Sequence, residues 1–175
     1  MQNYPNLLII AGTGRNSGKT TLACAVIEKF KNLKPVGLKI SPHFHEPSDG
    51  LRLINNEKDY RIFREISVSS GKDSSKMLAS GASEAYYIQV FDRNAEAAFA
   101  WLLENIDGNN PIICESPALG RFVKSGLLLI ADSNTIVNKK DLGPLYEQSD
   151  KTIMYGEADS LADTIAYKDG VWAIS

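Results

Sequence analysis

The apolar residues of this chain gather in short runs that are separated by polar and glycine-rich stretches. The clearest runs occupy residues 7–11, 36–40, 111–115 and 127–132. Continuous apolar runs of this length are typical of strands that are buried on both faces, as they are in a parallel sheet. Strands are also predicted at residues 86–91 and 152–155.

A helical period appears between these runs. Residues 22–30 carry one apolar stripe, which predicts an amphipathic helix directly after a glycine-rich loop. A second such stripe predicts a helix that begins at Asp92 or Asn94. A shorter helix is predicted over residues 73–80, with Asp73 as its N-cap.

Two segments have the pattern of β-hairpins. In the first, residues 51–54 and 60–66 flank a polar turn, and in the second, residues 164–167 and 171–174 flank Lys-Asp-Gly. Strands that alternate with helices predict an α/β fold of three layers, in which helices cover both faces of a mostly parallel sheet and the first hairpin is an insertion. No repeat or linker divides the chain, so we expect residues 1–175 to form a single domain.

The glycine-rich loop lies between the first predicted strand and the first predicted helix. It consists of Gly12, Thr13, Gly14, Arg15, Asn16, Ser17, Gly18, Lys19, Thr20 and Thr21. Glycines let successive backbone N–H groups turn inward, and the N-terminus of the following helix adds positive potential. A loop in this position can bind phosphate, so all ten residues are candidate nucleotide-binding residues.

The last three residues of the loop have predicted roles. Lys19 would reach the β- and γ-phosphates as a catalytic residue, the Thr20 hydroxyl would coordinate Mg²⁺, and Thr21 would lie nearer the α-phosphate. The strict form of this motif would place its first glycine at position 13, whereas this chain has Gly12 and one additional residue. The alternative is a turn that contains Gly-Lys-Thr by coincidence, but the flanking strand and helix favour a phosphate loop.

Charged residues at the ends of later strands are further candidates. Glu115 ends a buried strand, where an unpaired carboxylate would be costly, so it could hold Mg²⁺ or orient an attacking water. It could instead cap the following turn. Asp132 is a rival for the same role, but its strand comes later in the chain, which favours Glu115. Lys39 ends the second strand, at the edge where α/β sheets bind ligands, and would lie near a substrate or the phosphates, or else in solvent.

Two other polar segments could contribute to a site. His43 and His45 are the only histidines, and a metal site would need further ligands, so we expect them to face a substrate or solvent. Residues 138–141 match the Asn-Lys-x-Asp motif that recognises guanine, in which Asp141 would accept from two guanine donors and Asn138 would position the loop. An ordinary polar turn is the alternative. Asn138 and Asp141 are therefore candidate GTP-binding residues.

Composition and charge exclude several classes of function. The chain is 43% hydrophobic and 23% charged, as globular proteins are. Its net charge of −2 argues against a nucleic-acid partner or a membrane-surface protein. Cys24 and Cys114 lie in unrelated contexts, which suits a reducing cytoplasm. We expect no signal peptide and no membrane-spanning segment, because no apolar run approaches about 20 residues.

These motifs resemble those of known families. The longer form of the loop is similar to the loops of dethiobiotin synthetases and cobyrinic acid diamide synthases. Its inner part, residues 15–22, more closely resembles the MobB family of molybdenum-cofactor guanine dinucleotide biosynthesis. Three other segments are similar to MobB: the strand and histidine-containing loop at 36–45, the Lys-Asp-Ser helix at 71–82, and the strand at 112–115.

The resemblance covers most of residues 7–132 and implies a P-loop NTPase fold of the signal-recognition and MinD-like (SIMIBI) class, often dimeric, that binds GTP and Mg²⁺. It implies a weak NTPase that acts as an adaptor for a cofactor-biosynthesis enzyme. The other families imply an ATP-dependent ligase, in which Lys39 and residues 41–49 would hold a carboxylate substrate. A nucleotide-binding module without turnover is the third interpretation.

Overall fold

Strands and helices alternate along the computed structural model, which describes residues 1–14, 16–133, 142–154 and 156–175. In chain order the elements are β1 (Asn3–Gly12), α1 (Lys19–Lys29), β2 (Val36–Ser41), β3 (Leu51–Asn56), β4 (Tyr60–Glu65), α2 (Asp73–Ala79), β5 (Glu84–Val90), α3 (Ala95–Glu104), β6 (Ile112–Glu115), β7 (Lys124–Asp132), α4 (Pro144–Gln148), β8 (Lys151–Met154), α5 (Ala158–Thr164), β9 (Ile165–Lys168) and β10 (Val171–Ile174). Every strand and helix predicted within the described residues is present, with ends shifted by a few residues.

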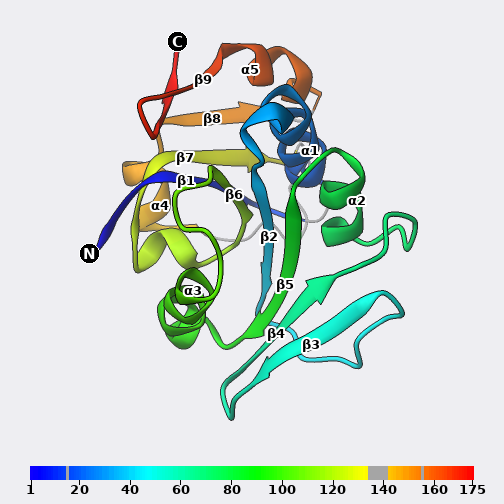
Figure 1. Cartoon of the computed structure of the whole chain (residues 1–175). Coiled ribbons are helices and arrows are strands. Elements are labelled where there is room, and N and C mark those ends of the chain that lie inside the picture. Colours follow the sequence, from blue (N-terminus) through cyan, green and yellow to red (C-terminus); the bar gives the residue numbers. More distant parts are fainter. Residues whose placement is uncertain (15, 134–141, 155) are drawn as a thin grey trace.

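One large sheet lies at the centre of the structure (Figure 1). Its strand order is β3-β4-β5-β2-β6-β1-β7-β8. The neighbouring strands β5, β2, β6, β1, β7 and β8 pair in parallel. Strands β3 and β4 form an antiparallel hairpin, and β4 pairs with β5 in the antiparallel direction. The predicted hairpin insertion is thus confirmed and extends the sheet. The second predicted hairpin, β9 and β10, forms a separate two-stranded sheet.

Helices cover both faces of the large sheet, as predicted. Successive residues of β1 alternate between the faces: Leu7 and Ile9 pack with residues of α3 and α4, while Leu8 and Ile10 pack with residues of α1, α2 and α5. All four side chains are fully buried. The same two groups of helices lie on opposite sides of the sheet in Figure 1. The continuous apolar run therefore belongs to a strand buried on both faces, and the three-layer α/β fold is confirmed.

Two short α-helices among the described residues were not predicted from the sequence. One is α4, which begins with Pro144. The other is α5, in which Ala158, Leu161 and Ala162 are buried against the face that α1 covers. The spacing of these three residues is helical, so a signal was present, but the segment is short and mostly polar around them. Short helices of this kind depend on packing more than on local preference.

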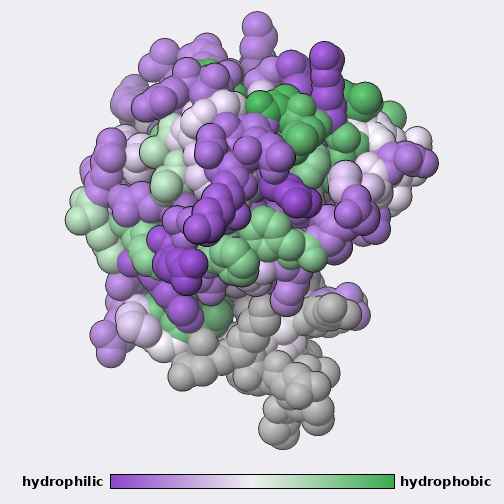
Figure 2. Space-filling view, turned by 90° about the horizontal axis from the view of Figure 1, so that it is seen from below, coloured by the Kyte–Doolittle hydropathy of each residue, from purple (hydrophilic) through white to green (hydrophobic). Residues whose placement is uncertain are grey.

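Within the described ranges, no helix combines the length and apolar character that a bilayer crossing requires. Seen from below, one face of the molecule is largely hydrophilic, and its hydrophobic patches are separated by polar side chains (Figure 2). Cys24 and Cys114 are free thiols, and burial raises the pKa of the Cys114 thiol, which lies inside β6.

Candidate functional site

A cavity of about 690 Å³ lies where β1, β2 and β6 end. We call it the phosphate-loop cavity. Its lining combines most of the glycine-rich loop with the ends of two strands and the start of a helix: Gly12, Gly14, Asn16, Ser17, Gly18, Lys19, Thr20, Thr21, Lys39, Ile40, Ser41, Pro42, His43, Asp73, Lys76, Glu115, Ser116 and Pro117. Ligands bind in this position in open α/β sheets, outside the carboxyl ends of the strands.

Two glycines give the loop its path. Gly18 caps α1 with φ = 88°, a left-handed conformation that favours glycine. At position 12, a Cβ atom would lie 2.5 Å from Cδ of Lys19 and 2.7 Å from Oγ of Ser17. The absence of a side chain at Gly12 therefore lets the stem of Lys19 cross the inside of the loop. This explains the glycine at position 12, one residue before the position of the strict motif.

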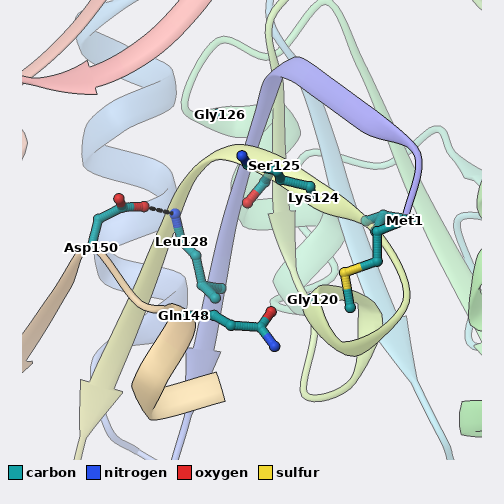
Figure 3. A pocket seen from close by; sticks show the side chains of 9 residues that line it. Met1, Gly120, Lys124, Ser125, Gly126, Leu128, Gln148 and Asp150 are labelled. Atoms are coloured by element: carbon teal, nitrogen blue, oxygen red, sulfur yellow. Dashed lines mark hydrogen bonds between the residues drawn. The ribbon is translucent and has the colours of Figure 1, made fainter. Parts of the chain in front are cut away.

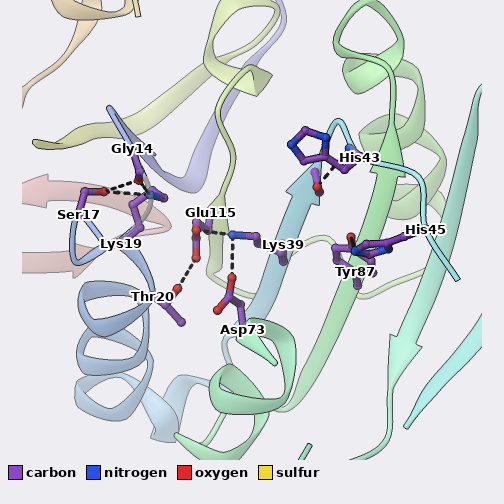
Figure 4. A network of polar contacts seen from close by, with 11 residues as sticks. Gly14, Ser17, Lys19, Thr20, Lys39, His43, His45, Asp73, Tyr87 and Glu115 are labelled. Atoms are coloured by element: carbon purple, nitrogen blue, oxygen red, sulfur yellow. Dashed lines mark hydrogen bonds and ion pairs between the residues drawn. The ribbon is translucent and has the colours of Figure 1, made fainter. Parts of the chain in front are cut away.

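Lys19 lies across the loop. Its ammonium donates to the carbonyl oxygen of Gly14 at 2.6 Å and to Oγ of Ser17 at 2.9 Å (Figure 4). The cation is thus held beside the loop backbone and borders the cavity, at the N-terminus of α1. Positive charge, a helix N-terminus and a glycine-rich backbone together favour an anion at this place.

Four charged and polar side chains from four different elements meet beside the loop, and we call them the Glu115 network (Figure 4). The Thr20 hydroxyl of α1 donates to Oε2 of Glu115 at 2.8 Å. The ammonium of Lys39, on β2, donates to Oε1 of the same carboxylate. It also pairs with Oδ2 of Asp73, the first residue of α2, at 2.8 Å. Glu115, which ends β6, is 2% exposed.

The charges within this network stabilise one another. Burial disfavours the charged form of Lys39, but the negative charges of Glu115 and Asp73 outweigh burial and raise the pKa of Lys39. Burial likewise opposes ionisation of Asp73, but the charge and hydrogen bond of Lys39 outweigh it and lower the pKa of Asp73. The three residues therefore form a cluster in which the Lys39 ammonium lies between the two carboxylates and pairs with both.

Oxygen atoms of this network fit a magnesium ion bound together with a nucleotide. Mg²⁺ in proteins is usually held by one or two carboxylates, with phosphate oxygens and waters completing its coordination. Thr20, Glu115 and Asp73 supply such oxygens. Among the described residues, no group of three or more His, Cys, Asp or Glu side chains is placed to hold a metal ion. Thr20 and Glu115 were predicted as metal ligands, and the structure places them in contact.

Asp73 was missed by the sequence analysis, which predicted it as an N-cap. That prediction is wrong: Lys72 is the N-cap of α2, and its side chain makes no capping hydrogen bond. Asp73 instead turns toward Lys39. The signal in the sequence was that Asp73 belongs to the Lys-Asp-Ser segment that resembles a MobB motif.

Asp132, the rival of Glu115, lies at the other end of the loop. Although its strand comes later in the chain, β7 pairs directly with β1. The Thr13 hydroxyl donates to Oδ1 of Asp132 at 2.9 Å, and the backbone N–H of Ser133 donates to Oγ1 of Thr13 at 2.8 Å. Thr13 is fully buried, so it fastens the start of the loop to β7. Glu115, in contrast, lies beside Thr20.

The structure separates the two histidines. His43 lines the phosphate-loop cavity. His45 contacts β5 instead: its Nε2 lies 3.3 Å from Oη of Tyr87, and the amide of Gln89 donates to its carbonyl oxygen at 2.8 Å. Arg15, Asn138 and Asp141 lie outside the described residues.

Comparison with known proteins shows which class of fold this chain has. No protein-family model matches the chain, and no curated protein matches its sequence. A solved structure that it resembles is that of the "apo" form of LpxK from Aquifex aeolicus in complex with ATP, with a TM-score of 0.55 and 13% sequence identity. The similarity covers 90% of this chain and 50% of that chain, so this chain spans about half the length of LpxK. The fold is that of P-loop nucleotide-binding proteins.

Proposed function

We propose that this chain binds a nucleoside triphosphate together with Mg²⁺ in the phosphate-loop cavity. The observation that carries the proposal is a hydrogen bond from Thr20 to Glu115. Thr20 follows Lys19 directly at the start of α1. The hydrogen bond brings the hydroxyl predicted to bind metal into contact with a buried carboxylate at the end of the neighbouring strand. The P-loop fold and the ATP that LpxK binds support the same proposal.

Each residue has a role in this proposal. Lys19 and the loop amides neutralise the phosphate charge. Thr20, Glu115 and Asp73 hold the metal ion, which supplies positive charge beside the transferred phosphoryl group. Glu115 also lies where it could orient an attacking water, which would give slow hydrolysis. The protein would then be a weak NTPase.

The nucleotide and the biological role are finer proposals. The Asn138–Asp141 motif supports GTP as the nucleotide, whereas the complex of LpxK with ATP supports ATP. The resemblance to MobB motifs supports an adaptor role in molybdenum-cofactor assembly. In this role the protein would be a homodimer in the cytoplasm and would act on a partner enzyme.

An ATP-dependent ligase is the second candidate. Lys39 and the residues that follow it, Ser41 to His43, line the same cavity as the phosphate loop, so a carboxylate substrate could approach the terminal phosphate. However, Glu115 and Asp73 already balance the charge of Lys39. A carboxylate substrate would have to displace one of them, so we place the NTPase first.

Thermal unfolding with GTP, with ATP and without nucleotide, each with Mg²⁺, tests the proposal. A ligand present at 100 times its dissociation constant stabilises the folded state by about 2.7 kcal/mol, which is readily measured. Stabilisation by GTP alone supports the guanine motif, and stabilisation by ATP alone contradicts it. No stabilisation by either nucleotide contradicts the proposed function. Phosphate release then separates an NTPase from a binding module, and release that requires an added carboxylate substrate supports the ligase.

A further inference from the structure

The ammonium of Lys39 occupies a position between two carboxylates that a metal ion could occupy. It contacts Oε1 of Glu115 and Oδ2 of Asp73, from two elements that are distant in the sequence. The Lys39 side chain is 20% exposed and that of Glu115 is 3% exposed, so this contact is shielded from water on most sides. Charges in such a place interact more strongly than charges on the surface.

Lys39 therefore conflicts with the metal site of the proposed function. Thr20 engages one oxygen of Glu115 and Lys39 engages the other. A divalent cation bound to Glu115 and Asp73 would lie beside the ammonium, and the two positive charges would repel each other. The negative charge of a triphosphate bound with the metal would offset this repulsion. A metal ion that binds without a triphosphate has nothing to offset it.

We propose that Lys39 is a tethered cation that competes with Mg²⁺ for Glu115 and Asp73, so that the metal binds only together with the nucleotide. This inference rests on the proposed function and adds a control of metal loading to it. Lys39 leaves the two carboxylates when the metal–nucleotide complex binds. It acts as a positioning residue, because its contacts with both carboxylates hold them close together until then.

The backbone around Asp73 keeps its carboxylate in place. Helix α2 packs closely on β2, since a Cβ atom at Gly37 would lie 2.9 Å from Cβ of Met77. The next residue of α2, Ser74, donates to Oε2 of Glu65 at 2.8 Å, and both side chains are buried. Asp73 consequently stays near Glu115 when Lys39 is removed. The two facing carboxylates should then attract a divalent cation without any nucleotide.

Binding of Mn²⁺ to the full chain without nucleotide tests this inference, with free Mn²⁺ measured by electron paramagnetic resonance. Lys39→Met removes the ammonium and retains the apolar stem, and we expect it to bind Mn²⁺ about tenfold more tightly than the wild type. Lys76→Met is the matched control, because Lys76 lines the same cavity but is exposed and lies on the next turn of α2. It should gain less Mn²⁺ affinity than Lys39→Met, because Lys76 acts on Asp73 through its charge alone. The double variant Lys39→Met/Asp73→Asn should lose the gain.

Several outcomes would overturn the inference. A folded Lys39→Met variant with wild-type Mn²⁺ affinity would do so, as would an equal gain in Lys76→Met. If Lys39→Met melts at a lower temperature than the wild type, Mn²⁺ should restore its melting temperature, and failure to do so counts against the exchange. Nucleotide binding by the wild type tests the proposed function separately. Tighter Mn²⁺ binding by Lys39→Met, with no nucleotide bound by the wild type, would support competition between Lys39 and a metal ion but overturn the proposed function.

Discussion

Two cavities lie at opposite ends of β7. The phosphate-loop cavity is near its last residue, Asp132, which hydrogen-bonds to Thr13 of the loop. The other cavity, about 420 Å³ in volume, is at its first residues, and we call it the Gly126 cavity (Figure 3). It is lined by Met1, Gly120, Val123, Lys124, Ser125, Gly126, Leu128, Gln148 and Asp150. The polar groups of the two cavities are arranged differently.

The difference is in how charged groups are used. In the phosphate-loop cavity, the side chains of Thr20, Lys39, Asp73 and Glu115 converge from four elements. In the Gly126 cavity, the Asp150 carboxylate accepts from the backbone N–H of Leu128 at 2.7 Å and thereby connects β7 to the start of β8. The first arrangement suits a ligand and the second holds the fold together. Polar groups that converge on a cavity are better evidence for a binding site than the cavity alone.

Lys19→Ala should produce the largest change in nucleotide binding. Loss of a charge-assisted contact to the phosphates lowers affinity by about a hundredfold, because such contacts contribute about 1.5–3 kcal/mol. Isothermal titration calorimetry with GTP and ATP measures this effect. Lys124→Ala, which removes a lysine from the Gly126 cavity, is the matched control and should retain wild-type affinity. Unchanged affinity in Lys19→Ala would show that the loop does not bind phosphate.

The fold could largely be predicted from the sequence because its signals are local. Runs such as 7–11 are apolar on both faces, and the structure buries both faces of β1. The hairpin at 51–66 was recognisable from its polar turn. The position of β7 beside β1 could not be predicted in this way, because chain order does not determine strand order in a sheet. The proximity of Asp132 to the loop was missed for the same reason.

Gly126→Ala should affect stability and leave nucleotide binding intact, which would sharpen the contrast between the cavities. A Cβ atom at this position would lie 2.0 Å from the backbone oxygen of Pro5, so the backbone of β1 or β7 must shift. Overpacking of this kind costs about 2 kcal/mol in the free energy of unfolding. Urea unfolding measures the loss. A folded variant with wild-type stability would contradict the close contact, and reduced affinity of the folded protein would contradict the separation of the two cavities.

The candidate site could be predicted only in part. Lys19, Thr20 and Glu115 follow from a contiguous motif and from the end of a buried strand. Asp73 depends on how closely α2 approaches β2, which Gly37 permits by leaving room for Met77. A glycine inside a strand often marks such a close approach, but the sequence does not show which element approaches. The structure was therefore needed to show which segments distant in the sequence contact one another at the candidate site.

Glu115→Gln should reduce the effect of Mg²⁺ on nucleotide affinity by about tenfold, since it removes one full charge from the proposed metal site. The amide oxygen can still accept from Thr20, but the amide NH₂ group then faces the Lys39 ammonium, so urea unfolding is used to check that the variant is folded. Nucleotide affinity is measured once with Mg²⁺ and once with a chelator. The variant should lose affinity only in the presence of Mg²⁺. Asp150→Asn makes the same chemical change in the Gly126 cavity and should alter neither affinity. Equal losses with and without Mg²⁺ would exclude a role of Glu115 at the metal.

Asp73→Asn gives the smallest expected effect, and its dependence on pH distinguishes a charged network from a simple hydrogen bond. The pKa of Asp73 is lowered from 3.8, so its stabilising contribution is present above that value and is lost as the pH falls through the lower folded-state pKa. The pKa of Lys39 is raised from 10.5, so the contribution of the ion pair is present below 10.5 and is lost as the pH rises through the folded-state pKa. The difference in unfolding free energy between the wild type and Asp73→Asn should therefore stay constant from about pH 5 to about pH 9 and shrink on both sides. Because the Asp73 side chain is 36% exposed, solvent screening keeps this difference small. Urea unfolding across this pH range measures it, and a difference that does not shrink in acid would show that Asp73 is not held as a carboxylate by Lys39.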